Sequence, residues 1–377
     1  MIFSINENVL NVINTIENAG GEAYIVGGCV RDMLLSRKPG DFDVTTSLTP
    51  EKVMSLFDKT VATGIKHGTV TVIINKENIE VTTYRTDGNY SDSRHPSEVH
   101  FVRNLTDDLA RRDFTVNAIA YNPKSGIVDK FSGTKDLNNR ILRTVGDPVK
   151  RFREDALRIM RLFRFACQLN FSIYKETKVA ALTLSGELKN ISRERIATEL
   201  FKALISPNPE MLSPLTESGA LSFCGINKGS VSCDIASLPK DRDIRFYKFI
   251  SDLKSNHTDV CKELKTDKTL QRFCCEVSEI SLNLPKSIPD CKRALKNYSK
   301  KAVSAALTLY GGDTTLISKI EKSKEPYQIK DLCITGEDLK KIGITGKAAG
   351  DALQNLIEQV IENPLLNKKE ILLKLLK

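Results

Sequence analysis

Apolar residues recur with two different periods along this chain of 377 residues. Residues 1–20 show helical spacing and end in Asn-Ala-Gly-Gly at 18–21, which is typical of a helix terminus. Residues 22–120 mix helical stretches with short β-branched runs, at 69–74, 79–83 and 99–102. From about residue 145 onward the spacing is almost wholly helical. We therefore predict an α+β protein, with a small mixed, largely antiparallel sheet and its helices first and an all-helical remainder after it.

Breaks in the apolar pattern divide the helical part of the chain. They contain Pro or Gly and fall at residues 206–209, 225–239, 285–289 and 311–312. We predict four parts, namely residues 1–140, 141–206, 207–310 and 311–377, and two of these breaks agree with their boundaries. A polar stretch at residues 85–96 lies between two predicted strands. It is long for a hairpin connection, and such loops are often functional.

The segment Glu154-Asp-Ala-Leu-Arg158 carries a pattern that can distinguish nucleobases. Cytosine and adenine present an amine donor beside a ring-nitrogen acceptor, whereas guanine and uracil present the reverse. A carboxylate only accepts hydrogen bonds and a guanidinium only donates them, so Asp155 and Arg158 together would select C or A. The alternative is an ordinary surface ion pair on one amphipathic helix, whose charged face also holds Arg151, Glu154 and Arg161.

Two carboxylates, Asp41 and Asp43, precede the β-branched residues Val44-Thr-Thr. We place both on one strand, where alternate side chains share a face and Phe42 would be buried beneath them. Carboxylates in this arrangement can bridge metal ions about 3.5–4 Å apart, and hard oxygen ligands suit Mg²⁺. The alternative is a solvated pair of acids on an edge strand.

Glycines and arginines with a phosphate-binding pattern flank these acids. Gly27-Gly28 follows the apolar run Ala23 to Val26 and opens a predicted helix that carries Arg31. Glycines at such a turn let backbone N–H groups approach a phosphate, and Arg31 would add a fixed charge. A plain tight turn is the alternative. Further along, the adjacent arginines Arg111 and Arg112, followed by Asp113, lead into the apolar run 116–121. The alternative is that one of the two arginines simply faces water.

Together these segments resemble, in order and spacing, the class II tRNA nucleotidyltransferase family of CCA-adding enzymes and their poly(A) polymerase relatives. The resemblance covers about residues 20–205. Its motifs are Ala23-Tyr-Ile-Val-Gly-Gly-Cys-Val-Arg-Asp, Gly40-Asp-Phe-Asp-Val, Lys66-His-Gly-Thr-Val, Arg111-Arg-Asp-Phe-Thr-Val-Asn-Ala, Arg151-Phe-Arg-Glu-Asp-Ala-Leu-Arg and Ile191-Ser-Arg-Glu-Arg-Ile. Beyond residue 205 the likeness is loose, although residues 331–350 and the amphipathic helix after them are similar to the family's tail.

The resemblance implies a polymerase-β-like nucleotidyltransferase head, a neck with the base-recognition helix, and a helical body and tail that bind tRNA. Asp41 and Asp43 would bind Mg²⁺ and carry the catalysis. The nucleotide-contacting positions would be Gly28, Arg31, Arg112, Asp155, Arg158, Arg161 and Arg164. The supporting positions would be Gly27, Asp113 and Glu154.

The implied activity is template-independent addition and repair of the 3′-terminal CCA of tRNA, with CTP and ATP as substrates and pyrophosphate as product. An enzyme that adds only A, or a poly(A) polymerase, is the first alternative. The intact polar segment at 84–100 argues against an enzyme that adds only CC, because those family members are shortened there. A catalytically inactive RNA-binding protein is the alternative of another class, and the presence of both Asp41 and Asp43 argues against it.

Charge is distributed unevenly along the chain. Residues 1–140 hold 16 Lys and Arg against 18 Asp and Glu, whereas residues 141–377 hold 40 against 29. A basic remainder fits an RNA partner, bound through the 3′ end and acceptor arm of tRNA, although it also fits plain solubility. The strongest basic cluster is either a phosphate-docking face for tRNA or a solvated helix, and it consists of Lys292, Arg293, Lys296, Lys300 and Lys301.

The nine cysteines lack metal-ligand spacing, and none forms Cys-x-x-Cys. We expect reduced, mostly buried thiols in a cytoplasmic protein, since the sequence shows no signal peptide. No apolar stretch approaches the length that spans a membrane, so we expect no membrane partner.

Overall fold

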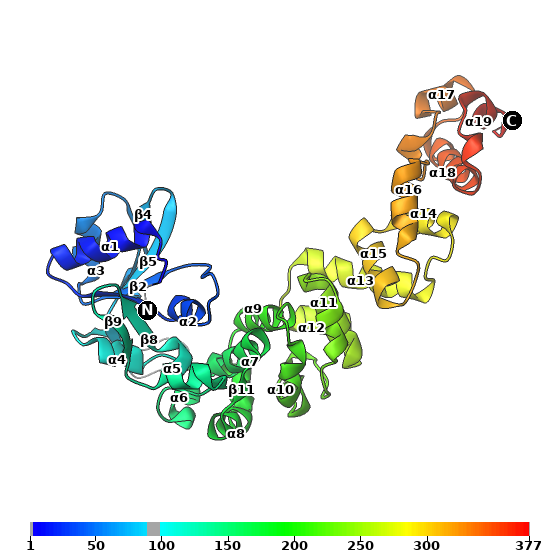
Figure 1. Ribbon diagram of the computed structural model, residues 1–377. Coiled ribbons are helices and arrows are strands. Elements are labelled where there is room, and N and C mark those ends of the chain that lie inside the picture. The colour runs from blue at the N-terminus through cyan, green and yellow to red at the C-terminus, as the bar shows by residue number, and fades with distance from the viewer. Residues whose placement is uncertain (1–2, 89–98, 377) are drawn as a thin grey trace. The chain divides into compact units, whose positions relative to one another are not determined.

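The computed structural model describes residues 3–88 and 99–376, which form two compact units (Figure 1). The first unit comprises Met1–Arg245 and Asp252–Ser255, and the second comprises Phe246–Ser251 and Asn256–Lys377. The first holds a mixed sheet followed by helices, and the second is helical, which confirms the predicted α+β class. The change between units falls within α11 (Arg242–Asp252) and not at residue 207, so the four-part division stays a prediction.

The sheet of the first unit has seven strands in the order β3-β4-β5-β2-β1-β8-β9. Only β2 and β5 pair in parallel, and the other neighbouring pairs are antiparallel, as expected from the sequence. The predicted run at 69–74 is β4, and the run at 79–83 lies within β5. The strands are β1 (Ala23–Val26), β2 (Asp43–Thr46), β3 (Thr60–Gly64), β4 (Thr69–Ile74), β5 (Glu77–Thr83), β8 (Ile119–Asn122) and β9 (Gly126–Asp129).

Side chains along these strands alternate between the two faces of the sheet, and each face carries an apolar layer. Ile25 joins the layer beneath α1 (Glu7–Asn18), α2 (Gly28–Leu34) and α3 (Pro50–Leu56), whereas its neighbour Val26 joins the layer beneath α4 (Leu105–Ala110). The side chain of Asn6 caps α1 by accepting from the Asn8 amide, and the helix ends at Asn18 as the sequence predicted. Asp43 and Glu80, paired in register, therefore point to the α4 side of the sheet.

Smaller elements complete the head. The predicted run at 99–102 contains β7 (Val99–Phe101), which pairs with β6 (Arg85–Asp87), and residues 89–98 of the polar segment lie outside the described residues. The short helical turns are η1 (Ile65–His67) and η2 (Thr115–Asn117). The chain leaves the head through α5 (Gly133–Asn138) and β10 (Ile141–Leu142), and β10 pairs with β11 (Ser172–Ile173).

The expected single helix around residue 155 is in fact two helices, α6 (Pro148–Glu154) and α7 (Leu157–Leu169). The break has a local cause. Asp155 has extended backbone angles (φ −146°, ψ 104°), and its Oδ1 accepts from the Leu157 amide at 3.0 Å, as an N-cap side chain does. α8 (Lys175–Thr183) and α9 (Arg193–Leu204) follow, and α9 packs against α7.

One buried arginine ties the end of α9 to the chain before α11. Arg245 is only 2 % exposed, and its guanidinium donates to five backbone carbonyls. Nη1 bonds Leu204 O and Ser206 O at 3.0 and 2.9 Å, Nη2 bonds Ala236 O and Leu238 O at 2.9 and 2.8 Å, and Nε bonds Pro239 O at 3.1 Å. The segment between holds α10 (Ser213–Glu217) and several short turns.

The second unit is built from helices that the predicted breaks separate. The break from Pro285 to Pro289 spans the start of α14, and Gly311-Gly312 stands between α15 and α16. Leu339, Leu356, Ile357 and Val360 form part of a separate apolar core near the C-terminus. The helices are α12 (His257–Glu263), α13 (Lys268–Leu282), α14 (Ile288–Asn297), α15 (Lys300–Leu309), α16 (Thr315–Ser323), α17 (Gly336–Lys341), α18 (Gly346–Glu362) and α19 (Lys369–Lys374).

Within residues 3–88 and 99–376, no helix is both long and apolar enough to cross a membrane. Six of the nine cysteines are buried and carry no disulfide, in agreement with the expectation of mostly buried thiols. The three exposed cysteines are Cys233, Cys275 and Cys333.

Candidate active site

The two predicted metal ligands line one open cavity of about 620 Å³ over the sheet. Asp43 opens β2, but Asp41 lies before the strand and is exposed, so the prediction of one shared strand is wrong for Asp41. The chain bends at residues 40 and 41, and strand pairing begins only where Asp43 faces Glu80. Phe42 is half-buried and packs against the apolar layer. The other lining residues are Val61, Thr63, Thr71, Ile73, Asn78 and Glu80.

The electrostatics of this cavity favour a cation. Burial is the largest cause that raises the pKa of Asp43; together with the negative charges of Asp41 and Glu80, and against the positive charge of Arg112, it brings this pKa to about 6. A divalent cation would relieve this crowding of like charges. Glu80 was not anticipated from the sequence, and its register opposite Asp43 is the signal that identifies it. In the described part of the chain, no group of three or more His, Cys, Asp or Glu has the geometry of a metal site.

The Gly27-Gly28 turn forms where the sequence placed it, between β1 and α2. Gly27 has φ +86°, a conformation that favours glycine, and its amide donates to Ile119 O at 3.2 Å. A Cβ at Gly27 would come within 3.1 Å of Arg112 Nη1, so the missing side chain leaves room for that guanidinium. Arg112 therefore lies beside the turn, and its charge also acts on Asp43.

A buried acid that the sequence analysis did not single out holds Arg111 and Arg112. Asp108 on α4 is fully buried, and its Oδ1 accepts from Arg111 Nη2 at 2.8 Å. Its Oδ2 accepts from Arg112 Nη2 at 3.3 Å and from Thr45 Oγ1 at 3.3 Å. The two guanidinium groups hold the pKa of Asp108 below its ordinary value even though burial opposes them. Arg112 Nε is buried without a hydrogen-bond partner, so Arg112 keeps a donor for a ligand.

Arg31 and Arg161 are joined by a buried polar chain. Arg31 Nη1 donates to Asn117 Oδ1 at 2.7 Å, and Asn117 Nδ2 donates to Asp113 Oδ1 at 3.0 Å. Asp113 Oδ2 in turn accepts from Arg161 Nε and Nη2 at 2.8 and 2.6 Å. Although burial acts in the opposite direction, Arg161 and Asn117 lower the pKa of Asp113 to about 2, so this carboxylate stays charged.

Asp155 and Arg158 lie close in the chain but do not bond to one another through their side chains. Asp155 Oδ2 accepts from Arg195 Nη2 on α9 at 2.9 Å. Arg158, only 8 % exposed, donates through Nη1 to Glu154 Oε2 at 2.6 Å and Arg151 O at 2.9 Å. Its Nη2 donates to the backbone oxygen of Arg111 at 3.1 Å. The alternative of an exposed surface ion pair is therefore wrong, and each side chain is held by separate partners.

Arg195 is a third residue to which the sequence analysis gave no role, after Glu80 and Asp108, although it lies in the motif Ile191-Ser-Arg-Glu-Arg-Ile. Its Nη1 is buried without a hydrogen-bond partner. Arg164, the last of the predicted nucleotide-contacting arginines, donates to Glu199 Oε2 at 2.5 Å and to Gln168 Oε1 at 3.0 Å. Arg158, Arg161 and Arg164 thus lie along α7, and α9 supplies the partners of Asp155 and Arg164.

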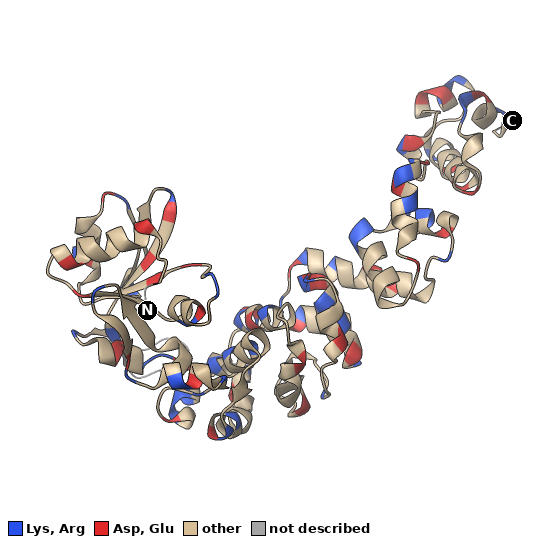
Figure 2. Ribbon diagram, in the orientation of Figure 1, with Lys and Arg blue, Asp and Glu red and all other residues tan. Residues whose placement is uncertain are grey.

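The predicted basic cluster in the second unit does not form a free cationic face. Lys292 is 1 % exposed and bonds Glu325 at 2.7 Å. Arg293 pairs with Asp290, Glu358 and Glu362, Lys296 with Glu358, and Lys300 with Glu321, while Lys301 Nζ lies 5.3 Å from the centre of the Phe273 ring. Acids elsewhere in the chain pair with four of the five cations, which argues against a free phosphate-docking face, whereas the 61% exposure of Lys300 fits a solvated helix. Bands of both charges alternate along the helices of this unit (Figure 2).

Three family descriptions match consecutive parts of this chain. The Poly A polymerase head domain matches residues 23–143, the probable RNA- and SrmB-binding site of polymerase A matches residues 170–224, and the putative domain 2 of tRNA nucleotidyltransferase matches residues 246–376. The first contains the carboxylate cavity and the Gly27-Gly28 turn. The last lies almost wholly in the second unit.

Relatives match over nearly the full length. The CCA-adding enzyme of Ligilactobacillus salivarius is 36% identical over 386 residues, covering 97% of this chain and 95% of the relative. That of Anoxybacillus flavithermus is 38% identical over 372 residues, covering 96% and 92%. The crystal structure of the Bacillus stearothermophilus CCA-adding enzyme in complex with CTP superposes with a TM-score of 0.85 at 30% identity, covering 98% and 96% of the two chains. This chain belongs to the family of CCA-adding enzymes.

Proposed function

We propose that this protein completes and repairs the 3′-terminal CCA of tRNA without a template, using CTP and ATP and releasing pyrophosphate. The observation that carries the proposal is a pair of acids in one cavity of the head, in a chain whose neck holds a half-buried Asp155 and a buried Arg158, each with separate partners. Membership of the CCA-adding family and the CTP complex of the Bacillus stearothermophilus relative support the same activity.

Asp41 and Asp43 would hold Mg²⁺. Their oxygens are the ligand type that Mg²⁺ prefers, and the pKa of Asp43 is raised first by burial and then by nearby negative charge, which a divalent cation would neutralise. When bound, the metal would lower the pKa of the terminal ribose hydroxyl and offset the charge that develops on the α-phosphate. The protein's own part is to hold the two carboxylates at one cavity.

The arginines would hold the triphosphate. Arg112 keeps a buried donor beside the Gly27-Gly28 turn, and the backbone at Gly28 opens α2 next to it. Arg31, Arg161 and Arg164 are each fixed by a neighbouring acid or amide, so their positions would be set before the nucleotide arrives. Side chains fixed in this way lose little conformational freedom when they bind a ligand, so they can hold the triphosphate at a small entropic cost.

Asp155 and Arg158 would read the base. A carboxylate offers about four lone-pair sites, and Asp155 uses two of them, on the Leu157 amide and on Arg195. The remaining sites can accept the exocyclic amine of C or A, and Arg158 can donate to the ring nitrogen. Glu154 would support this reading by holding the guanidinium of Arg158.

For tRNA docking, an exposed basic segment in the second unit replaces the cluster around Lys292. Residues 340–348 contain three exposed lysines and no acid, and no ion pair in the described part of the chain engages these lysines. They are Lys340, Lys341 and Lys347, at the end of α17 and the start of α18. Cations that are not neutralised by the protein are the ones able to displace counterions from RNA phosphates.

The test uses three tRNA substrates, lacking CCA, ending in C, and ending in CC, each with one labelled nucleotide and Mg²⁺. We expect C on the first two and A on the third, with Asp41→Ala and Asp43→Ala inactive yet still binding tRNA. Incorporation of A alone would assign the protein as an A-adding enzyme, and repeated A addition to any RNA would assign a poly(A) polymerase. No incorporation, with tRNA binding intact, would leave the RNA-binding alternative.

A further inference from the structure

One aromatic ring lies at the centre of the arginine cluster. Phe165 on α7 is 5 % exposed, and the guanidinium carbons of Arg164, Arg31 and Arg161 lie 3.8, 5.1 and 5.5 Å from its ring centre. All three distances fall within the range of cation–π attraction. The edge of the ring contacts Phe114 in a T-shaped arrangement at 5.8 Å, so its orientation is fixed from the apolar side.

The three cations come from two parts of the first unit. Arg31 belongs to α2 beside the sheet, whereas Arg161 and Arg164 belong to the neck helix α7. Three guanidinium groups around one point repel each other, and the charge of Arg161 contributes to lowering the pKa of Arg164, after burial as the largest cause. Some group must offset this repulsion for the cluster to persist when no phosphate is bound.

Acids offset the repulsion from the outside of the cluster. Arg31 pairs with Asp32, Arg161 with Asp113, and Arg164 with Glu199. A fourth acid in the middle would neutralise the cations and repel a phosphate. An aromatic ring attracts guanidinium groups through its electron-rich face but carries no net charge, so it can hold the cluster together and leave it cationic.

We propose that Phe165 is a positioning residue, whose ring gathers Arg31, Arg161 and Arg164 into one site for the triphosphate of either nucleotide. This inference rests on the proposed function. Because CTP and ATP share the triphosphate, loss of the ring should weaken both by the same factor. Phe165 contacts none of the reacting groups, so its loss should raise KM and leave kcat close to that of the unchanged protein.

The experiment compares three variants of the full-length protein. Phe165→Leu keeps an apolar side chain but removes the ring, and Phe165→Tyr restores it. Phe163→Leu is the matched control, because Phe163 lies two residues away on α7, is fully buried, and faces a different side of the helix. KM and kcat for CTP and ATP are measured with the melting temperature, and inorganic tripolyphosphate binding is measured by calorimetry without tRNA.

We expect Phe165→Leu to weaken CTP, ATP and tripolyphosphate each about tenfold, which corresponds to about 1.4 kcal/mol. Phe165→Tyr should stay near the unchanged protein, and Phe163→Leu should lower the melting temperature without changing KM. Unchanged tripolyphosphate affinity in Phe165→Leu, or equal losses in Phe165→Leu and Phe165→Tyr, would overturn the proposal. The tripolyphosphate measurement needs no nucleotide addition, so failure of the unchanged protein to extend tRNA would refute only the proposed function.

Discussion

Replacement of Asp155 by alanine removes the only acceptor in the base-reading pair. In the protein, Oδ2 of Asp155 accepts from Arg195 at 2.9 Å, and the remaining lone pairs are available for the amine of C or A. Without the carboxylate, that amine and the Arg195 guanidinium both lose an acceptor in a half-buried site. An unsatisfied polar group costs about 1–3 kcal/mol. We therefore expect kcat/KM for CTP and ATP to fall by about 5- to 150-fold, at 1.4 kcal/mol for each factor of ten.

The same change should relax the exclusion of UTP and GTP. These bases present a carbonyl where C and A present the amine, so in the unchanged protein the carbonyl would face the carboxylate of Asp155. Alanine removes that repulsion. Incorporation of UTP and GTP should therefore fall less than that of CTP and ATP, or rise.

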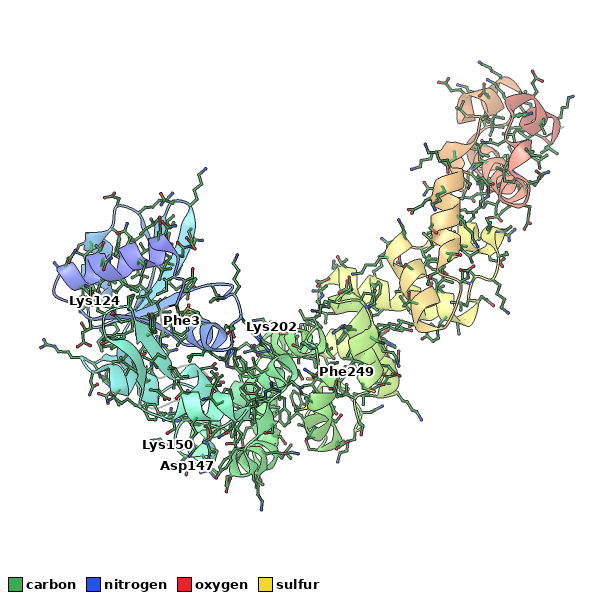
Figure 3. All side chains as sticks on the ribbon, in the orientation of Figure 1. Phe3, Lys124, Asp147, Lys150, Lys202 and Phe249 are labelled. Carbon is green, nitrogen blue, oxygen red and sulfur yellow. The ribbon has the colours of Figure 1, made fainter. Side chains whose placement is uncertain are left out.

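The assay measures single-turnover incorporation of all four nucleotides by the unchanged protein, Asp155→Ala, Arg158→Ala and a capping control. Asp147→Ala is that control, since Asp147 accepts from the Lys150 amide at 2.9 Å at the start of α6 (Figure 3). Both aspartates cap a helix, so each loss should cost about 0.5–2 kcal/mol of stability. Only the Asp155 change should alter selectivity. Full discrimination among the four nucleotides in both Asp155→Ala and Arg158→Ala would refute the base-reading assignment.

Three further outcomes concern pH, salt and stability. The pKa of Asp43 is raised to about 6, mainly by burial. The contribution of this carboxyl group to stability is therefore fully present below the ordinary carboxyl pKa and is lost as pH rises through 6. Asp43→Asn, measured in EDTA, should raise the melting temperature at pH 8 but not at pH 4. Joint replacement of Lys340, Lys341 and Lys347 by glutamine should reduce the salt dependence of tRNA binding by up to about 0.9 log units for each duplex phosphate that the protein no longer neutralises. Arg293→Gln with Lys296→Gln is the control and should change this slope little, because acids already pair with both side chains. Equal slopes in the two variants would reject the docking assignment. Arg245→Met leaves five backbone carbonyls, two of them in buried bonds, without their donor. It should lower the free energy of unfolding by about 3–5 kcal/mol, by analogy with broken buried charge networks, as measured by urea denaturation.

Local patterns predicted the helices and strands well because they depend on neighbours in the chain. The β-branched run at 69–74 is a strand, and the glycines at 20 and 21 follow the end of α1. The errors came from side chains that compete with the backbone. At residue 155 the apolar period continues through the break, but the Asp155 carboxylate caps Leu157 and divides the helix.

The site was predicted in its residue types but not in its pairings. The alternative interpretation paired Asp155 with Arg158 in a surface ion pair, whereas their partners within the protein are Arg195 and Glu154. Arg195 lies 40 residues along the chain, and Glu358, which neutralises Arg293 and Lys296, lies more than 60 residues away. Such partners come together only in the folded protein, so a cluster of lysines and arginines in the sequence does not predict a basic surface.

The carbonyl cage around Arg245 has a consequence for how the region between α9 and α11 opens. The five carbonyls belong to residues 204–206 and 236–239, at the two ends of a segment that contains only one short α-helix, α10. Neither end can move away without breaking several bonds to the same guanidinium. A protease should therefore cut residues 207–235 slowly in spite of their turn-rich backbone, and cleavage there should follow the unfolding of the whole first unit more closely than the fraying of a surface loop.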